Sequence, residues 1–222
     1  MNRRTLPALT ALATATALLL TACGGESSEA DEKIPGAGES SAEASASPSE
    51  KGEAKEGFDR PELKFPSDVE FKFGWQKPSG AKEAAVLKDT EEYLKSIIHG
   101  ITKQDPADSA HKFYAVPLSQ AATYAEDQIK RAKEAGNTVS GVQQFPSAQV
   151  KLSGTRTASV TYCQDESKFY SKTVKEGKVK VTEPSNNSYY SFTLVLEAPS
   201  AGEGPWRAKA ISGKQGVAEC AA

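Results

Sequence analysis

The chain has 222 residues, of which 25% are charged, and its formal net charge is −2. The charges are divided unevenly, because residues 24–57 hold nine acidic side chains and three lysines, whereas residues 58–222 hold 22 basic and 20 acidic ones. Neither part has the excess of basic residues that is typical of domains that bind nucleic acid, so we expect no nucleic-acid partner.

The N-terminus has the pattern of a secretory signal peptide. Arg3 and Arg4 precede an uncharged run from Thr5 to Ala22 that ends in small residues. A basic start, an apolar stretch and small residues before a cleavage point are typical of such signals. A transmembrane helix is the alternative, but threonines and a proline dilute the run and no basic cluster follows it. We therefore predict a signal peptide over residues 1–22.

The end of this run, Leu20-Thr21-Ala22-Cys23, resembles the lipobox of bacterial lipoproteins, with a leucine three positions before the cysteine and small residues between them. The resemblance implies that Cys23 carries a diacylglycerol and anchors the protein at the extracytoplasmic face of the cell membrane. Each buried CH₂ of an acyl chain contributes about 0.8 kcal/mol, and lasting attachment needs two or more chains. A stray cysteine near a cleavage site is the alternative.

After the cysteine we predict a disordered acidic tether, so that residues 23–57 form the lipidated cysteine and its linker. The segment is almost entirely Gly, Ser, Ala and Glu, with Ile34 as its only large aliphatic residue. Such a composition cannot bury enough apolar surface to offset the entropy of ordering. A flexible coil of this length spans roughly 30–35 Å, which would hold the folded part away from the membrane.

The folded part, residues 58–222, is predicted to begin with a short strand and a long helix. Apolar and polar residues alternate from Val69 to Trp75, which indicates a strand. Ser79 can cap a helix over about 81–101, where apolar residues follow a 3.6-residue period. The residues on this stripe are Val86, Leu87, Thr90, Tyr93, Leu94, Ile97, Ile98 and Ile101.

Two shorter helices are predicted next. The pair Asp105-Pro106 is typical of an N-cap followed by proline at the first helical position. We therefore predict a short helix that begins there and ends at about Tyr114. Pro117 or Ser119 begins another, which Gly136-Asn137 ends with residues common at helix C-termini.

After residue 137 the helical period disappears and β patterns follow. We predict strands over about 148–152 and 158–163, a hairpin that turns at Glu176-Gly177-Lys178, and strands over 189–197 and 206–211. Helices followed by antiparallel strands predict an α+β fold in which the helices pack on one face of a curved antiparallel sheet.

This order of elements is similar to that of the NTF2-like (cystatin-like) superfamily, and of actinobacterial lipoproteins that carry such a domain behind an acidic tether. The resemblance spans about residues 75–220 and rests on the element order, on Tyr162-Cys163-Gln164-Asp165 and on the last strand with Trp206 and its terminal cysteine. It implies a single cone-shaped NTF2-like domain over 58–222. The alternative is another helix-on-sheet α+β fold, or a small β-barrel with a helical lid.

With Cys23 lipidated, two cysteines remain in the exported domain, Cys163 and Cys220. An even pair in an oxidising compartment predicts a disulfide, and two separate buried thiols are the alternative. A redox dithiol or a metal site is disfavoured, because there is no C-x-x-C and no metal-ligand spacing. We therefore expect neither a metal nor another cofactor.

The candidates for catalysis are few. His99 and His111 are the only histidines and could act as general bases, but their places near a helix end and in a short helix favour structural roles. The resemblance to NTF2-like isomerases implies an aspartate base and a tyrosine or acid donor inside the cone. The residues of those types that could fill these roles are Asp105, Asp165, Tyr93, Tyr162 and Tyr190.

None of these residues can be assigned a catalytic role from the sequence. Capping explains Asp105, and a polar turn after Cys163 explains Asp165-Glu166. We therefore predict a membrane-anchored lipoprotein that serves as a non-catalytic binding or assembly module at the cell envelope, with an envelope protein as its partner. The alternatives are a protein that binds a small apolar ligand, in a pocket lined by aromatic residues of the strands, and an isomerase-like enzyme.

Overall fold

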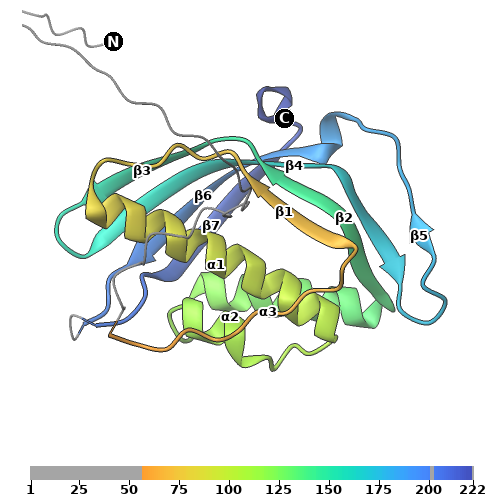
Figure 1. The fold of residues 1–222 in the computed structure, drawn as a ribbon, viewed down its shortest axis with the longest axis horizontal. Helices are drawn as coiled ribbons and strands as arrows, with labels where there is room; N and C mark the ends of the chain where they lie inside the picture. Colours follow the sequence, from red (N-terminus) through yellow and green to blue (C-terminus); the bar gives the residue numbers. More distant parts are fainter. Residues whose placement is uncertain (1–56, 201–202, 222) are drawn as a thin grey trace, which may run out of the picture. The chain divides into compact units, whose positions relative to one another are not determined.

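The computed structural model describes residues 57–200 and 203–221 (Figure 1). The predicted signal peptide, Cys23 and the tether up to residue 56 lie outside the described residues. None of the described helices is long and apolar enough to span a membrane. In chain order the elements are β1 (Val69–Phe73), α1 (Ala81–Lys103), α2 (Ser109–Tyr114), α3 (Gln120–Glu134), β2 (Asn137–Phe145), β3 (Ala148–Ser153), β4 (Thr157–Thr173), β5 (Val179–Lys180), β6 (Tyr189–Glu197) and β7 (Arg207–Gln215), with 3-10 turns at Asn186–Ser188 and Ala218–Cys220.

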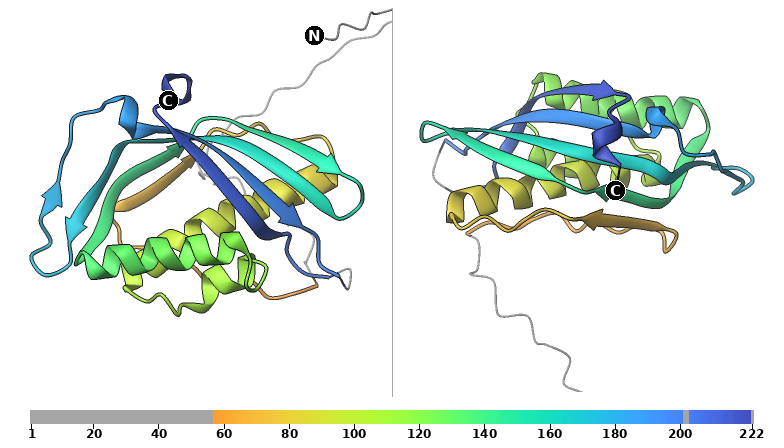
Figure 2. Two further views of the ribbon diagram at one scale, coloured as in Figure 1. Left: turned by 180° about the vertical axis from the view of Figure 1, so that it is seen from behind. Right: turned by 90° about the horizontal axis from the view of Figure 1, so that it is seen from above.

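The sheet arches over the helices, which lie on its concave side (Figures 1 and 2). Its main path has the order β1-β2-β4-β6-β7, while β3 and β5 pair with β4. This is the α+β arrangement that was predicted, with helices on one face of a curved sheet. The sheet is not wholly antiparallel, however, because β1 runs parallel to β2. The chain between these two strands passes through α1, α2 and α3, and such a long crossover connection is what parallel pairing requires.

The central strand, β4, is much longer than predicted. It has 17 residues and pairs with β2, β3, β5 and β6. The interpretation of Asp165-Glu166 as a turn is wrong, since both residues lie within the strand. The strand β2 was not predicted at all. Polar residues such as Gln143 and Gln164 are buried on these strands, and they obscure the alternation of apolar and polar residues from which a strand is predicted.

A β-bulge lies where β2 and β4 pair. The register shifts between Val142 and Gln144, where Glu166 and Ser167 of β4 lie opposite the single residue Gln143 of β2. An extra residue of this kind bends a strand and changes the direction of the side chains beside it. The bulge therefore accounts for the closeness of Glu166 and Gln143, which belong to different strands.

The helices begin close to the predicted positions, but two of the three caps differ. Asp108 caps α2 by accepting a backbone hydrogen bond of 2.8 Å, so this helix begins at Ser109 and not at Pro106. No side chain caps α1, so the predicted capping role of Ser79 is wrong. Ser119 caps α3 as predicted, with its hydroxyl oxygen accepting a backbone hydrogen bond of 3.1 Å.

The hydrophobic core lies between the helices and the concave face of the sheet. Every residue of the apolar stripe predicted for α1 is buried, which confirms that this face of the helix packs inward. The sheet contributes a matching set of fully buried side chains, among them Val160, Tyr162, Leu194 and Leu196. Burial of this apolar surface is the main force that holds α1 against the strands.

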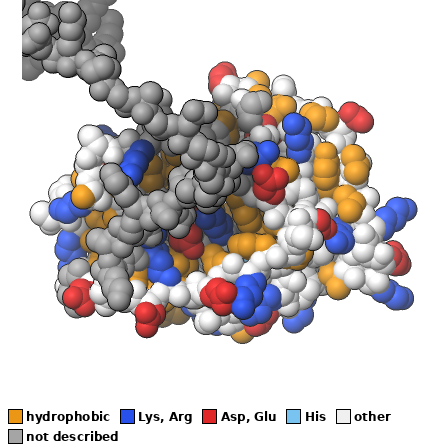
Figure 3. All heavy atoms as spheres, viewed as in Figure 1, with side chains coloured by type: hydrophobic (Ala, Val, Ile, Leu, Met, Phe, Trp, Pro, Cys, Tyr) orange, Lys and Arg blue, Asp and Glu red, His pale blue; other side chains and the backbone are white. Residues whose placement is uncertain are grey.

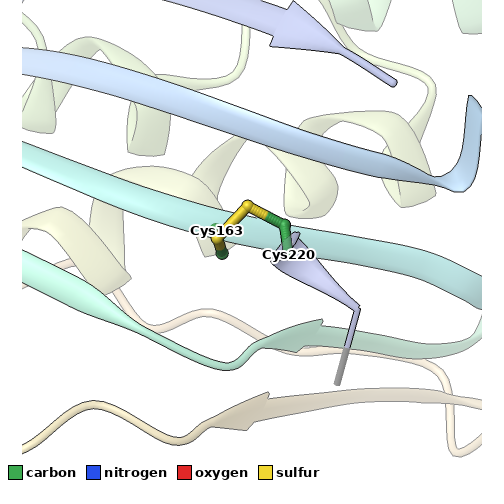
Figure 4. Close-up of a disulfide and its surroundings, with 2 residues drawn as sticks. All are labelled: Cys163 and Cys220. Atoms are coloured by element: carbon green, nitrogen blue, oxygen red, sulfur yellow. A yellow bond between two sulfur atoms is a disulfide. The ribbon is translucent and has the colours of Figure 1, made fainter. Parts of the chain in front are cut away.

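On the opposite face of the sheet, a disulfide fastens the C-terminal turn to β4. Cys163 in β4 is bonded to Cys220, with their Cα atoms 5.0 Å apart (Figure 4). The C-terminal turn lies on the side of the sheet that faces away from the helices (Figure 1). Because side chains alternate along a strand, this disulfide leaves the neighbours Tyr162 and Gln164 on the concave side.

Candidate ligand-binding cavity

A cavity of about 390 Å³ lies between α1, α3 and the concave side of β2 and β4. Cavities of about 300–1,000 Å³ are typical of small-molecule sites. Much of its wall is apolar, formed by Leu94, Ile97, Ile98, Ile101, Phe145 and Phe169. The aliphatic residues in this wall belong to the stripe of α1 that was predicted from its period.

Polar side chains gather on the sheet side of the cavity, around the carboxyl group of Glu166. Its Oε1 atom accepts a hydrogen bond of 2.6 Å from the amide of Gln164 and one of 3.2 Å from the amide of Gln143. Both amides are buried, with exposed fractions of 9% and 4%. Among the described residues, no lysine or arginine forms an ion pair with Glu166. The carboxyl is therefore held by neutral donors alone.

The pKa of Glu166 is raised from its ordinary value of 4.5. Burial is the main cause, since it disfavours the charged form, and the hydrogen bonds from Gln164 and Gln143 oppose it only in part. The neighbouring Asp165 raises the pKa further. Glu166 thus binds a proton more readily than an exposed glutamate does, and can act either as a hydrogen-bond donor or as an acceptor.

Tyr162 lines the same cavity and has an unusual hydroxyl group. The residue is 1% exposed, and its buried hydroxyl has no hydrogen-bond partner among the residues that the structure describes. Burial raises its pKa well above the ordinary value of 10.0, so the group stays protonated at neutral pH. A buried hydroxyl without a partner costs about 1–3 kcal/mol, so a partner inside the cavity would stabilise the protein.

A second tyrosine, Tyr124 of α3, also lines the cavity. Burial raises its pKa to about 12, and the nearby Glu166 adds to the effect. It is therefore a further hydroxyl donor at neutral pH. The remaining polar wall comes from the end of α3 and the start of β2, with Gln128, Arg131, Asn137 and Thr138.

Of the residues suggested for an isomerase-like site, only Tyr162 lines the cavity. Asp105 accepts a backbone hydrogen bond of 2.9 Å in the turn before α2. Asp165 is buried and accepts a hydrogen bond of 2.7 Å from the backbone of Ser167. Tyr93 donates a hydrogen bond of 2.9 Å to the backbone of Ala121, so its hydroxyl is used in packing α1 on α3.

The fifth candidate and the two histidines also lie outside the cavity wall. The hydroxyl of Tyr190 accepts a hydrogen bond of 2.8 Å from Gln215 of β7. His99 is buried with its Nδ1 atom 3.4 Å from a carboxylate oxygen of Asp108. His111 is also buried, and its pKa is lowered by burial first and by Lys112 second. Neither histidine lines the cavity, and the structural roles expected for them stay predictions.

Sequence reasoning missed Glu166, the carboxyl that does lie in the cavity. It missed Gln143 as well, because β2 was not predicted. One signal was present: Tyr162, Gln164 and Glu166 follow each other at a spacing of two and would share one face of a strand that continued past residue 163.

The arrangement can hold a molecule with an apolar body and one polar group. The aliphatic wall would cover the body, while Tyr162 and Glu166 would meet the polar group. No cluster of three or more His, Cys, Asp or Glu side chains within the described ranges could hold a metal ion. A carboxyl of raised pKa near protonated tyrosines also has the groups that proton transfer requires.

Comparison with known proteins gives likenesses of fold only. No family model matches the chain, and none of the curated proteins does. A ketosteroid isomerase-like protein from Erwinia carotovora atroseptica is 11% identical with a TM-score of 0.40, covering 61% of this chain and 97% of that one. An NTF2-like superfamily protein from Salmonella enterica is 13% identical with a TM-score of 0.42, covering 61% and 93%. A putative ketosteroid isomerase from Shewanella frigidimarina is 13% identical with a TM-score of 0.36, covering 60% and 98%.

Proposed function

We propose that this domain binds a small, largely apolar molecule that carries one hydrogen-bonding polar group. The observation that carries the proposal is the buried hydroxyl of Tyr162, which has no partner among the described residues and shares a cavity with the partly buried carboxyl of Glu166. Native proteins rarely leave a buried hydroxyl without a partner, and a ligand atom in the cavity would supply one for Tyr162. The aliphatic wall supplied by α1 determines that the rest of the ligand is apolar.

Binding at the cell envelope follows if the N-terminal predictions hold. The resemblance of Leu20-Thr21-Ala22-Cys23 to a lipobox supports a lipid anchor on Cys23, although this segment lies outside the described residues. The domain is then a ligand-binding module at the extracytoplasmic face of the membrane. Replacing Cys23 by serine should release the protein from membranes into the soluble fraction. Continued retention of the Cys23→Ser protein would refute the anchor without bearing on the cavity.

Binding can be tested with 2-naphthol, which has an apolar body, one hydroxyl group and its own fluorescence. The purified protein should bind it, and Tyr162→Phe should weaken the affinity about five- to tenfold, since one hydrogen bond contributes about 1 kcal/mol. Tyr190→Phe is the matched control, because its hydroxyl bonds Gln215 and lies outside the cavity wall. Equal affinities for the parent and Tyr162→Phe would contradict the proposal, and so would no binding at all.

The second candidate function is an isomerase-like proton transfer, which the raised pKa of Glu166 favours. A base of this kind removes a proton next to a carbonyl group while hydroxyl donors stabilise the oxygen. The test is exchange of the acidic protons of 2-tetralone for deuterium, followed by NMR with the parent and with Glu166→Gln. Exchange that the parent accelerates and Glu166→Gln does not would support an enzyme. If exchange proceeds at the buffer rate with both proteins while 2-naphthol binds, the protein binds a ligand and does not catalyse this proton transfer.

A further inference from the structure

The hairpin that joins β4 to β5 contains most of the longest exposed run among the described residues. We define it as residues 168–182. All residues from 174 to 187 are exposed, and β5 itself pairs with β4 over only two residues. The turn is nevertheless closed by two hydrogen bonds between Thr173 and Lys178. The backbone N–H of Thr173 donates a hydrogen bond of 2.9 Å to the carbonyl oxygen of Lys178, and the hydroxyl of Thr173 accepts one of 3.0 Å from the backbone N–H of Lys178. The hairpin is therefore a preformed projection.

This hairpin concentrates positive charge relative to the rest of the domain. It contains five lysines and one glutamate within 15 residues, whereas the rest of residues 58–222 holds 17 basic and 19 acidic side chains. Lys172 pairs with Asp68 at 2.7 Å, at the base of the hairpin. Among the described residues, no acidic side chain forms an ion pair with Lys175, Lys178 or Lys180. Averaging charges over residues 58–222 conceals this cluster, so the local charge was not evident from the sequence count.

The hairpin also exposes apolar side chains. Four large hydrophobic residues are exposed in the part of the chain that the structure describes, and three of them belong to the hairpin: Val174 at 49%, Val179 at 37% and Val181 at 69%. Figure 3 shows hydrophobic side chains beside Lys and Arg side chains at the end of the molecule that carries β5. Apolar residues that gather on a surface mark a site of contact.

Lysines on an edge strand also prevent pairing with other chains, and this role would account for the charge alone. It does not account for the valines, which a purely protective edge would replace by polar residues. A nucleic acid would neutralise the lysines but would leave the valines in water. Val179 and Lys180 are successive strand residues and point to opposite faces of the hairpin. An anionic lipid surface suits both kinds of side chain when the hairpin enters it edge-on, because lysines then contact the phosphates while valines enter the headgroup layer.

We propose that the hairpin of residues 168–182 binds the surface of a membrane that contains anionic phospholipid. Lys175, Lys178 and Lys180 supply the attraction, and the three exposed valines supply shallow apolar contact. The proposal rests on the hairpin and does not depend on the cavity. Because Tyr170 and Ser171 line the cavity and belong to the same hairpin, docking would bring that side of the cavity near the lipid.

The test uses the chain from residue 24 onward, which lacks the signal segment and Cys23 but contains every described element, the core and the disulfide. Its sedimentation is measured with vesicles of phosphatidylglycerol and phosphatidylcholine, and with vesicles of phosphatidylcholine alone. The parent should bind the first kind and not the second. The triple variant Lys175→Glu, Lys178→Glu, Lys180→Glu should bind at least tenfold more weakly, since each lysine near an anionic surface contributes to attraction.

Two controls separate this site from general electrostatics. The triple variant Lys77→Glu, Lys82→Glu, Lys151→Glu makes the same change in net charge at exposed positions before and at the start of α1 and on β3, elements that lie away from β5 (Figure 1). Its affinity for the anionic vesicles should fall less than threefold. The affinity of the double variant Val179→Ser, Val181→Ser for the vesicles should fall several-fold, while its preference for the anionic vesicles should remain. Circular dichroism confirms that all variants are folded. Equal losses from the two lysine triples, or no binding of the parent to anionic vesicles, would overturn the proposal.

Discussion

The amide of Gln164 donates a hydrogen bond of 2.6 Å to the carboxyl of Glu166, two residues farther along the same strand. Residues two apart in a strand share a face, so both side chains lie on the cavity side together with Tyr162. The bulge between β2 and β4 then brings Gln143 to the same carboxyl. A carboxyl group is thus held inside an otherwise largely apolar cavity by two neutral amides, and its proton affinity is set mainly by burial.

Replacing Tyr162 by phenylalanine should stabilise the protein when no ligand is present. The change removes a buried hydroxyl that has no partner among the described residues, so we expect the free energy of unfolding to rise by about 1 kcal/mol in urea titrations. Tyr93→Phe is the matched control, because its buried hydroxyl does donate to the backbone of Ala121 and its loss should cost about 1 kcal/mol. Equal destabilisation by both changes would show that the hydroxyl of Tyr162 has a partner.

Replacing Glu166 by glutamine should change how stability depends on pH. Because the pKa is raised in the folded state, the folded protein holds this proton more tightly than the unfolded chain does. The resulting stability is fully present below the unfolded pKa and is lost as pH rises through the folded pKa. The free energy of unfolding of Glu166→Gln minus that of the parent should therefore increase as pH rises above about 4.5, the ordinary value, and then level off. Urea titrations from pH 4 to pH 8 measure this difference, and a decrease with rising pH would contradict it.

Reduction of the disulfide should destabilise the domain substantially. Cys163 and Cys220 are 57 residues apart in sequence. A crosslink of that span lowers the conformational entropy of the unfolded chain and thereby stabilises the folded state by about 4 kcal/mol. Urea titrations with and without reductant measure the loss, and the double variant Cys163→Ser, Cys220→Ser should behave like the reduced parent. Intact mass with a thiol-reactive reagent provides the check. If the native protein shows two free thiols before reduction, the crosslink does not form.

Replacing Asp89 by alanine should be among the most damaging changes on α1. This carboxylate is 2% exposed, lies 2.6 Å from the guanidinium of Arg60 and accepts a 2.7 Å hydrogen bond from the backbone of Trp206. Removing one member of a buried pair typically costs about 3–5 kcal/mol. The exposed pair of Lys130 with Glu134 on α3 is the control, since Glu134→Ala should cost less than about 1 kcal/mol. Similar losses in the free energy of unfolding for both variants would show that the buried carboxylate of Asp89 contributes no more to stability than an exposed ion pair does.

Local patterns predicted the helices well because the physics that forms them is local. The stripe from Val86 to Ile101 recurs every 3.6 residues, and Ser119 supplies a hydroxyl at the start of α3. The predicted cap at Asp105 was wrong, because Asp108 caps α2. Both accept backbone hydrogen bonds two residues ahead, and only the folded chain decides which of the two turns continues as a helix.

The strands that form the candidate site were the least predictable part. Their polar residues face a cavity, so burial does not require them to be apolar, and the period-2 signal is lost between residues 137 and 145 and after residue 163. The bulge adds a shift of register that depends on the partner strand. Sequence reasoning therefore assigned Asp165-Glu166 to a turn and left the carboxyl of the cavity unrecognised.

The sequence by itself determined the α+β class and the inward face of α1, while its division into a signal peptide, an acidic tether and a domain stays a prediction. These follow from composition and from periods that span only a few residues. Only the tertiary structure decided that Glu166 meets Gln143 across two strands, and that the hydroxyl of Tyr162 is buried with no partner among the described residues. Each of these depends on the strand pairing that no local pattern encodes, because pairing joins residues that are distant in sequence.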